Sequence, residues 1–255
     1  MSRSELFSLL SFDLREAFNS VSFVVYDWFF FGFQFFIYGV ILSKLIVTLS
    51  NYLFYYGTGL LVLMSFNVAS WSGRRFVESA HEGRLRYLLS LPITRGEMFL
   101  EQLLLGMVVN LSRLLPPLFV ILALSHLYTP YSLAISLLVL TLVTIGIMGL
   151  MISLSVIAFR SFDIYSAIVA SLSALLIRFS TINYPLSSMP KAYVGVSLAN
   201  PVTYGADLLR SAIGLDTSVV LNPALGATVV IALCIGTIFV GIFFISTVVE
   251  GVKSS

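Results

Sequence analysis

Six long runs of apolar residues, separated by short polar segments, set the pattern of the chain. A helix needs about 20 mostly apolar residues to cross the ~30 Å hydrocarbon core of a bilayer. Each run approaches or exceeds that length, so each predicts a transmembrane helix. The predicted spans cover about residues 27–49, 52–71, 98–125, 132–159, 164–182 and 219–249. We therefore expect an all-α integral membrane protein with six transmembrane helices in a single transmembrane domain, residues 1–255.

The N-terminal segment 3–21 has another pattern, in which apolar residues recur at spacings of three and four and the charges fall mostly elsewhere. This periodicity predicts an amphipathic helix. Such a helix can lie in the membrane interface with its apolar side toward the lipid, or it can pack on other protein. The charges spread through this segment do not fit a cleaved signal peptide.

Composition agrees with a membrane protein. Hydrophobic residues make up 58% of the chain and charged residues 10%, whereas a soluble domain is about 45–50% apolar and about 25% charged. The single cysteine, Cys234, lies inside the last apolar run. One thiol makes neither an internal disulfide nor a metal site, so we expect Cys234 to be a packing residue and expect no metal.

The placement of Lys and Arg predicts the orientation. With the N-terminus inside and six spans, most basic residues outside the spans fall on the cytoplasmic side, as the positive-inside bias requires. The inner set is Arg3, Arg15, Arg74, Arg75, Arg84, Arg86, Arg95, Arg160 and Lys253, and the outer set is Lys191 and Arg210. We expect a multi-pass protein of the plasma membrane with both termini cytoplasmic and an extracytoplasmic segment at 183–218.

The one long charged stretch, residues 73–97, has helix signals of its own. Leu85, Leu88 and Leu89 share one helical face, and Pro92 ends that short helix. Thr94 then fits the N-cap of the third span, with Glu97 completing a capping box. A short cytoplasmic helix between two spans can be gripped and moved by a partner. An ordinary solvated loop is the alternative.

Two sequence blocks resemble the type 2 ABC transporter permeases, the membrane subunits of exporters for drugs, lipids and polysaccharides. The first, EGRLRYLLSLPITRGE at residues 82–97, lies between the second and third spans. The second, NPVTYGADLLR at residues 200–210, comes just before the last span. Either block alone is weak evidence, but their order and their places on opposite sides of the membrane are more specific. The chain has Gly83-Arg84 where the family often has Gly-Thr, a departure that bears on docking to the ATPase.

The resemblance implies a mechanism in which two permease subunits, here expected as a homodimer, work with two ABC ATPase subunits. The cytoplasmic segment would be a coupling helix seated on the ATPase, and the outer segment would form short re-entrant helices that cap the exit. The coupling residues would be Glu82, Gly83, Leu85, Leu88, Leu89 and Pro92, and the outer gate residues would be Asn200, Pro201, Tyr204 and Arg210.

The chain itself has no site for ATP hydrolysis. A P-loop needs a lysine after a glycine, because backbone amides and that lysine cradle the phosphates. The lysines are Lys44, Lys191 and Lys253, and none follows a glycine. ATP and Mg²⁺ are therefore expected on the partner subunit, and no cofactor or nucleic acid is expected on this chain.

Arg113 falls near the middle of the third span. A charge there is costly and usually faces protein or water. It either lines the translocation path, where it would contact an anionic substrate or lipid headgroup, or has a structural partner. Asp207 and Arg210 are three residues apart and are expected to pair on a short helix.

Two other functional classes fit less well. A membrane-embedded enzyme needs a nucleophile and base or a set of metal ligands, but His81 and His126 are predicted on opposite sides and the chain has no HExxH motif. A secondary transporter or channel not driven by ATP usually needs carboxylates inside its spans, and here Asp27, Glu101 and Asp163 are predicted near span ends. The sequence does not name the cargo.

Overall fold

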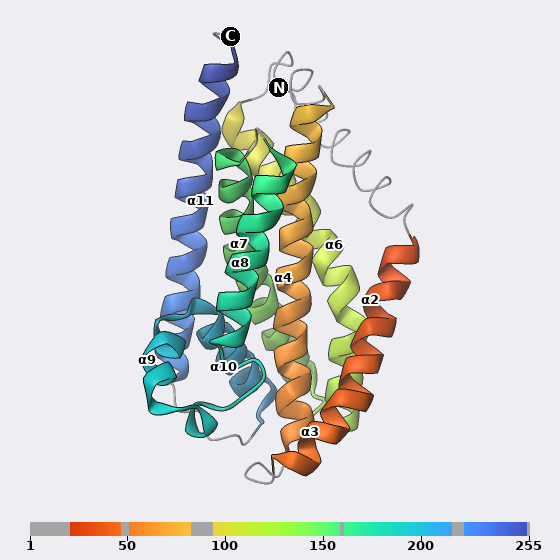
Figure 1. The fold of residues 1–255 in the computed structure, drawn as a ribbon. Helices are drawn as coiled ribbons and strands as arrows, with labels where there is room; N and C mark the ends of the chain where they lie inside the picture. Colours follow the sequence, from red (N-terminus) through yellow and green to blue (C-terminus); the bar gives the residue numbers. More distant parts are fainter. Residues whose placement is uncertain (1–20, 47–50, 83–93, 159–160, 216–221, 254–255) are drawn as a thin grey trace.

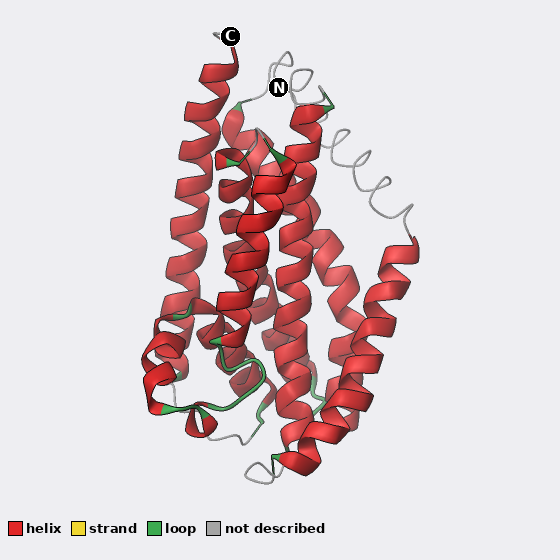
Figure 2. Cartoon of the chain, in the orientation of Figure 1, coloured by secondary structure: helices red, strands yellow, loops and turns green. Residues whose placement is uncertain are grey.

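The computed structural model describes residues 21–46, 51–82, 94–158, 161–215 and 222–253. Within these ranges the chain forms helices joined by turns, with no β-strand, which confirms the all-α prediction (Figure 2). The predicted interfacial helix at 3–21 falls almost entirely outside the described residues, so it stays a prediction.

The described helices form an elongated bundle (Figure 1). They are α2 (Val21–Phe33), the π-helix η1 (Gln34–Tyr38), α3 (Gly39–Leu45), α4 (Tyr52–His81), α6 (Arg95–Leu124), α7 (Pro130–Ile157), α8 (Phe162–Arg178), the 3₁₀ turn η2 (Leu186–Ser188), α9 (Lys191–Ala199), α10 (Pro201–Ile213) and α11 (Pro223–Lys253).

Five helical segments are long and apolar enough to cross a membrane. They are Val24–Leu45, Tyr52–Ser79, Gly96–Leu124, Pro130–Ile157 and Pro223–Ile245. The sixth predicted span, 164–182, corresponds to α8, which has 17 residues. At 1.5 Å per residue α8 is about 26 Å long, a little short of the ~30 Å hydrocarbon core. The protein is therefore a multi-pass membrane protein, and the count of six remains a prediction.

The second helix is longer than its apolar run. We expected the span to end near Trp71, but α4 continues to His81. Its last turns carry an ion pair between Arg74 Nε and Glu78 Oε1 at 2.9 Å, which stabilises a helix because residues four apart lie on one face. Backbone hydrogen bonding sustains the helix beyond the point where hydrophobicity ends.

The core of the bundle lies around α4 and α7, the most buried of the five candidate spans. α7 packs on α4 and on α11. The contact with α11 depends on Gly149, where an added Cβ would lie 2.6 Å from Oγ1 of Thr237. Small residues are expected wherever membrane helices approach this closely.

The two ends of the bundle differ. The last turn of α4, the first turn of α6 and the last turn of α11 lie at one end (Figure 1). The short helices α9 and α10 lie toward the opposite end, where α10 packs on α4. The described edges of the first sequence block, at the end of α4 and the start of α6, are therefore at the opposite end of the molecule from the second block.

Candidate functional site

The predicted coupling segment is described only at its two edges. Glu82 is the residue at which α4 ends, and Gly83, Leu85, Leu88, Leu89 and Pro92 lie outside the described residues. Its second edge confirms the predicted capping box. Thr94 Oγ1 accepts a hydrogen bond from the Glu97 amide at 3.3 Å, and the Thr94 amide donates to Glu97 Oε2 at 2.7 Å. The coupling helix itself stays a prediction.

The outer block begins with a corner that ties three helices together. Asn200 caps α10, because its Oδ1 accepts from the Val202 amide at 3.0 Å, and Pro201 occupies the first turn. The Asn200 Nδ2 group donates to the carbonyls of Leu176 and Phe179 at 2.7 and 3.1 Å. These carbonyls belong to the end of α8, where a helix leaves acceptors without partners. Asn200 thus caps the start of α10 and the end of α8.

Tyr204 belongs to the same corner. Its hydroxyl donates to the carbonyl of Leu198 in α9 at 2.8 Å. The structure therefore brings Asn200, Pro201 and Tyr204 together as the joint between α8, α9 and α10. Their function as an outer gate stays a prediction.

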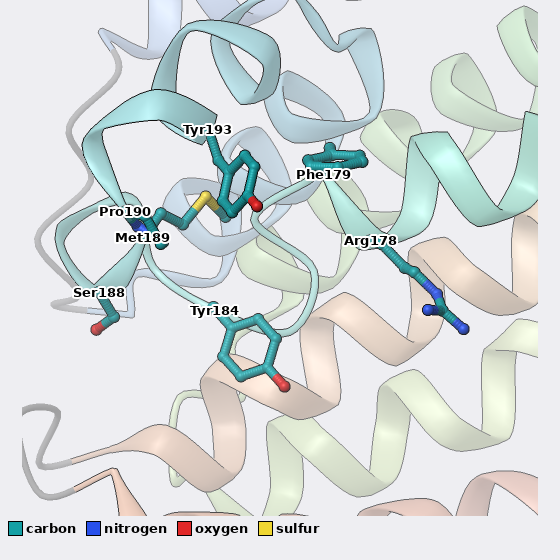
Figure 3. Close-up of a pocket in the computed structure, with 7 residues that line it drawn as sticks. All are labelled: Arg178, Phe179, Tyr184, Ser188, Met189, Pro190 and Tyr193. Carbon is teal, nitrogen blue, oxygen red and sulfur yellow. The ribbon is translucent and has the colours of Figure 1, made fainter.

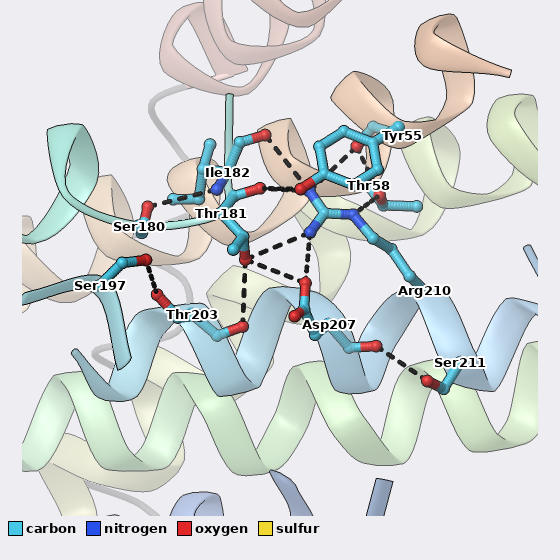
Figure 4. Close-up of polar contacts among 10 residues, drawn as sticks. All are labelled: Tyr55, Thr58, Ser180, Thr181, Ile182, Ser197, Thr203, Asp207, Arg210 and Ser211. Atoms are coloured by element: carbon cyan, nitrogen blue, oxygen red, sulfur yellow. Dashed lines mark hydrogen bonds and ion pairs between the residues drawn. The ribbon is translucent and has the colours of Figure 1, made fainter. Parts of the chain in front are cut away.

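Arg210 lies at the centre of a buried polar cluster (Figure 4). The side chain is fully buried and forms the predicted ion pair with Asp207, between Nη1 and Oδ1 at 2.7 Å. The guanidinium also stacks on the Tyr55 ring, with Cζ 3.5 Å from its centroid. Arg210, predicted as a residue of the outer gate segment, lies inside the protein because the amphipathic helix α10 turns this face toward α4 and α7.

The guanidinium makes six hydrogen bonds to three segments of the chain. The acceptors are Asp207 Oδ1 on α10, Thr58 Oγ1 and the Tyr55 carbonyl on α4, and three oxygens of residues 181–182: Thr181 Oγ1 and the carbonyls of Thr181 and Ile182. Buried charges persist only when paired and hydrogen-bonded. The cluster meets that condition and fixes α10 to α4.

Arg113 is the second buried arginine, and its surroundings are sparser. Its side chain is 9% exposed, and Nη1 pairs with Oδ2 of Asp27 on α2 at 2.8 Å. Its Cζ lies 5.9 Å from the ring centroid of Trp71 on α4. The prediction left a structural partner as one alternative, and Asp27 is such a partner. Whether Arg113 also contacts cargo stays a prediction.

The α2 contact next to Arg113 follows from a proline. Pro117 has no N–H, so it leaves the carbonyl four residues earlier, that of Arg113, without its helical donor. The indole Nε1 of Trp28 donates to this carbonyl at 3.0 Å. Helix α6 runs unbroken through Pro116 and Pro117. The proline pair thereby creates an acceptor that holds α2.

One pocket lies beside the outer corner (Figure 3). Its volume is about 380 Å³, and the rings of Phe179 and Tyr193 meet edge to face there at 5.4 Å. Arg178 contributes to the lining, but its guanidinium extends away from these rings (Figure 3). In the part of the chain that the structure describes, no three His, Cys, Asp or Glu side chains are placed to hold a metal ion.

Sequence reasoning missed the partners of both arginines. Thr58 and Thr181 are single hydroxyls in apolar surroundings, and nothing in their spacing pairs them with Arg210 over 152 and 29 residues. Asp27 was placed near a span end. The only signal for it was that a charge within a membrane span usually has an opposite charge as its partner.

Residues 4–213 of the chain match the protein family described as ABC-2 type transporter. The match covers most of the 255 residues and includes both sequence blocks. No curated protein matches the chain.

Proposed function

Because the chain belongs to the ABC-2 type transporter family and is its membrane permease subunit, we propose that it forms the translocation path of an ATP-driven exporter. The ABC-2 membrane domain lacks ATPase activity, and such permeases generally pair with ABC ATPase subunits. The further elements of the proposal are six spans in one domain, cytoplasmic termini, a coupling helix at 82–92 and an assembly of two permeases with two ATPases.

This proposal is supported by the separation of α10 from the helix ends that flank the first sequence block. The end of α4 and the start of α6 lie at one end of the bundle, and α10, which contains the second block, lies toward the other (Figure 1). Helix α8 starts at the end where α7 stops, and α9 and α10, which follow it, lie toward the other. This connection supports α8 as the sixth span in spite of its length.

Coupling would work through the ends of two long helices. Helix α4 extends to His81 beyond its apolar part, and α6 starts at a capped residue, Thr94. A movement of the segment between them would therefore move both helices, which pack on each other. The end of α4 also contacts α8, since the Arg74 guanidinium lies 4.6 Å from the centre of the Phe162 ring. ATP-driven motion would thus reach three spans.

The coupling role is tested by Leu88→Asp and Leu89→Asp in the complex with its ATPase. Both variants should insert normally but lose ATP-driven transport, because an ionised carboxylate cannot occupy an apolar groove. Leu88→Met, which preserves volume and apolarity, should transport like the wild type. Full transport by both Asp variants would refute the coupling role.

Orientation is tested by cysteine labelling. The native Cys234 is buried, so a Cys234→Ser background isolates an introduced thiol. Arg84→Cys should react with a membrane-impermeant maleimide only after the cells are opened, and Lys191→Cys should react in intact cells. The reverse pattern would overturn the topology.

The assembly is tested by purification and mass measurement. We expect two permeases and two ATPases, with transport that requires ATP hydrolysis. The described part of α2 and η1 has exposed apolar side chains, including Phe29 at 72% and Phe36 at 53%, which lipid or a second copy would cover. A chain that purifies without any ATPase and transports in the absence of ATP would be a secondary transporter or channel instead.

A further inference from the structure

The Arg113 site has unused hydrogen-bonding capacity. Among the described residues the guanidinium makes one ion pair, through Nη1 to Asp27, while Nε is buried and has no acceptor. No acceptor for Nη2 occurs in the described ranges either. An arginine has five N–H donors in a rigid fork, and its Nε–Nη2 edge matches the two oxygens of a carboxylate or phosphate. At Arg113 this edge has no acceptor among the described residues.

The site also lies within the apolar part of the bundle. At 1.5 Å per residue, Arg113 is about 27 Å from the start of α6 and about 17 Å from its end. Helix α6 presents an apolar stripe to the surroundings on the face opposite Arg113: Leu100, Leu104, Val108, Leu115 and Phe119 are all more than 40% exposed. On α2, Trp28 is 40% exposed and Phe29 72%. A ligand that reaches Arg113 along α2 must have an apolar part.

We propose that the Nε–Nη2 edge of Arg113 binds the oxyanion of an amphiphile, a phosphate or carboxylate attached to an apolar tail, which enters from the lipid along the contact between α2 and α6. The Trp71 ring centroid lies 5.9 Å from the Arg113 Cζ, and an anion that pairs with both nitrogens approaches in the guanidinium plane. Asp27 is a positioning residue, which holds the fork by Nη1 and leaves the other edge available.

Asp27 fits this role better than that of a complete partner. Its carboxylate binds a single nitrogen of Arg113, and its side chain is 24% exposed. A structural ion pair in an apolar site is expected to be bidentate or to have further hydrogen bonds. The site is also attached to α2 by the Trp28 indole, which keeps Asp27 in place without occupying the guanidinium.

The chain contains its own reporters for this site. It has two tryptophans, Trp28 and Trp71, and both lie next to Arg113. Bromine atoms on lipid chains quench nearby tryptophans. The full chain in phosphatidylcholine nanodiscs is titrated with a brominated phosphatidic acid and, in parallel, with a brominated diacylglycerol that has the same chains and no phosphate. Phosphatidic acid should reach half-maximal quenching at a mole fraction about tenfold lower than diacylglycerol does.

The variants separate binding from general attraction. The double variant Asp27→Asn/Arg113→Gln replaces the ion pair by two neutral amides, so no charge is left buried and alone. Its tryptophan fluorescence should be quenched equally by both lipids. Arg178→Gln removes the same charge from an exposed position and should keep the preference. Arg113→Lys retains the charge without the fork, and its preference should fall about threefold. Equal quenching in the wild type, or an undiminished preference in the double variant or in Arg113→Lys, overturns the proposal.

The source of the anion is a second measurement. The inference rests on the proposed export function only where it concerns cargo. The complex with its ATPase is placed in vesicles that contain fluorescent phosphatidic acid, and the movement of this lipid between leaflets is measured. ATP-dependent movement in the wild type, and not in the double variant, identifies an exported amphiphile. Selective quenching without such movement identifies a resident anionic lipid. A complex that transports nothing with ATP would contradict the export function and leave the quenching result standing.

Discussion

The two buried arginines, Arg210 and Arg113, both belong to helices of the apolar bundle but differ in the number of their hydrogen-bond partners. Arg210 has no exposed surface and makes six hydrogen bonds to α4, α10 and residues 181–182. Arg113 makes one ion pair, to α2, and has a buried Nε without an acceptor. The first charge is saturated by its own protein, whereas the second is not.

This difference distinguishes an arginine that stabilises the structure from one that has donors left to bind a ligand. A guanidinium whose donors are all satisfied cannot accept a ligand without losing bonds, so Arg210 anchors α10 rather than moving with cargo. Helix α10 is therefore held to α4 through a rigid cluster, and we expect greater motion in α9, which packs less extensively on the described helices. A guanidinium with an open edge gains hydrogen bonds when an anion arrives.

The largest expected effect is that of Arg210→Ala. It leaves the Asp207 carboxylate buried and several carbonyls without donors, so the free energy of unfolding should fall by about 3–5 kcal/mol. Thermal denaturation of the purified chain in nanodiscs measures this loss. Asp207→Asn/Arg210→Gln, which removes the unpaired charge, should recover part of it. Equal stability of Arg210→Ala and the wild type would show that the cluster is not an anchor.

Lysine replacements sharpen the comparison. Lysine has three donors on a point charge, so Arg210→Lys gives up at least three of the six bonds and should cost about 2–3 kcal/mol of unfolding free energy. Arg113→Lys retains the single pair with Asp27 and should cost about 0.5 kcal/mol. The two melting temperatures are compared in the same nanodiscs. Similar losses would remove the distinction between the sites.

Arg113→Gln should lower the free energy of unfolding by about 1–2 kcal/mol, less than Arg210→Ala, because it removes a single ion pair and the Asp27 side chain left behind is not fully buried, at 24% exposed. Adding Asp27→Asn should restore most of this loss. Chemical denaturation of Arg113→Gln, Asp27→Asn and the double variant gives the coupling between the two residues. A loss as large as that of Arg210→Ala would mean that Arg113 is also an anchor.

The smallest effect is expected at the corner beside the Arg210 cluster. Tyr204→Phe removes one hydrogen bond, from the hydroxyl to the Leu198 carbonyl, and should cost about 0.5 kcal/mol, a typical value for such bonds in membrane proteins. Thermal denaturation measures stability, and hydrogen exchange of α9 measures the local effect. Faster exchange in α9 with unchanged exchange in α10 is expected. A uniform increase in both helices would mean that they open as one unit.

Much of the fold was predictable from the sequence because it depends on local properties. Runs of apolar residues predicted the five described helices that are long enough to cross a membrane, since backbone polar groups in lipid must bond within the helix. Thr94 and Glu97 predicted the start of α6, because a capping box uses residues three apart. The charge placement predicted that the ends of α4 and α6 next to residues 82–97 lie opposite residues 200–210, and the described helix ends are arranged in this way.

Only the tertiary structure decided what the charges do. The pair of Asp207 and Arg210 follows from their spacing, but the burial of Arg210 depends on α4 and residues 181–182, which are distant in sequence. Asp27 and Arg113 are 86 residues apart, and no periodicity links them. Hydrophobicity and capping act within one helix and can be read along the chain. The partner of a buried charge depends on which helices meet, and that is a property of the packed bundle.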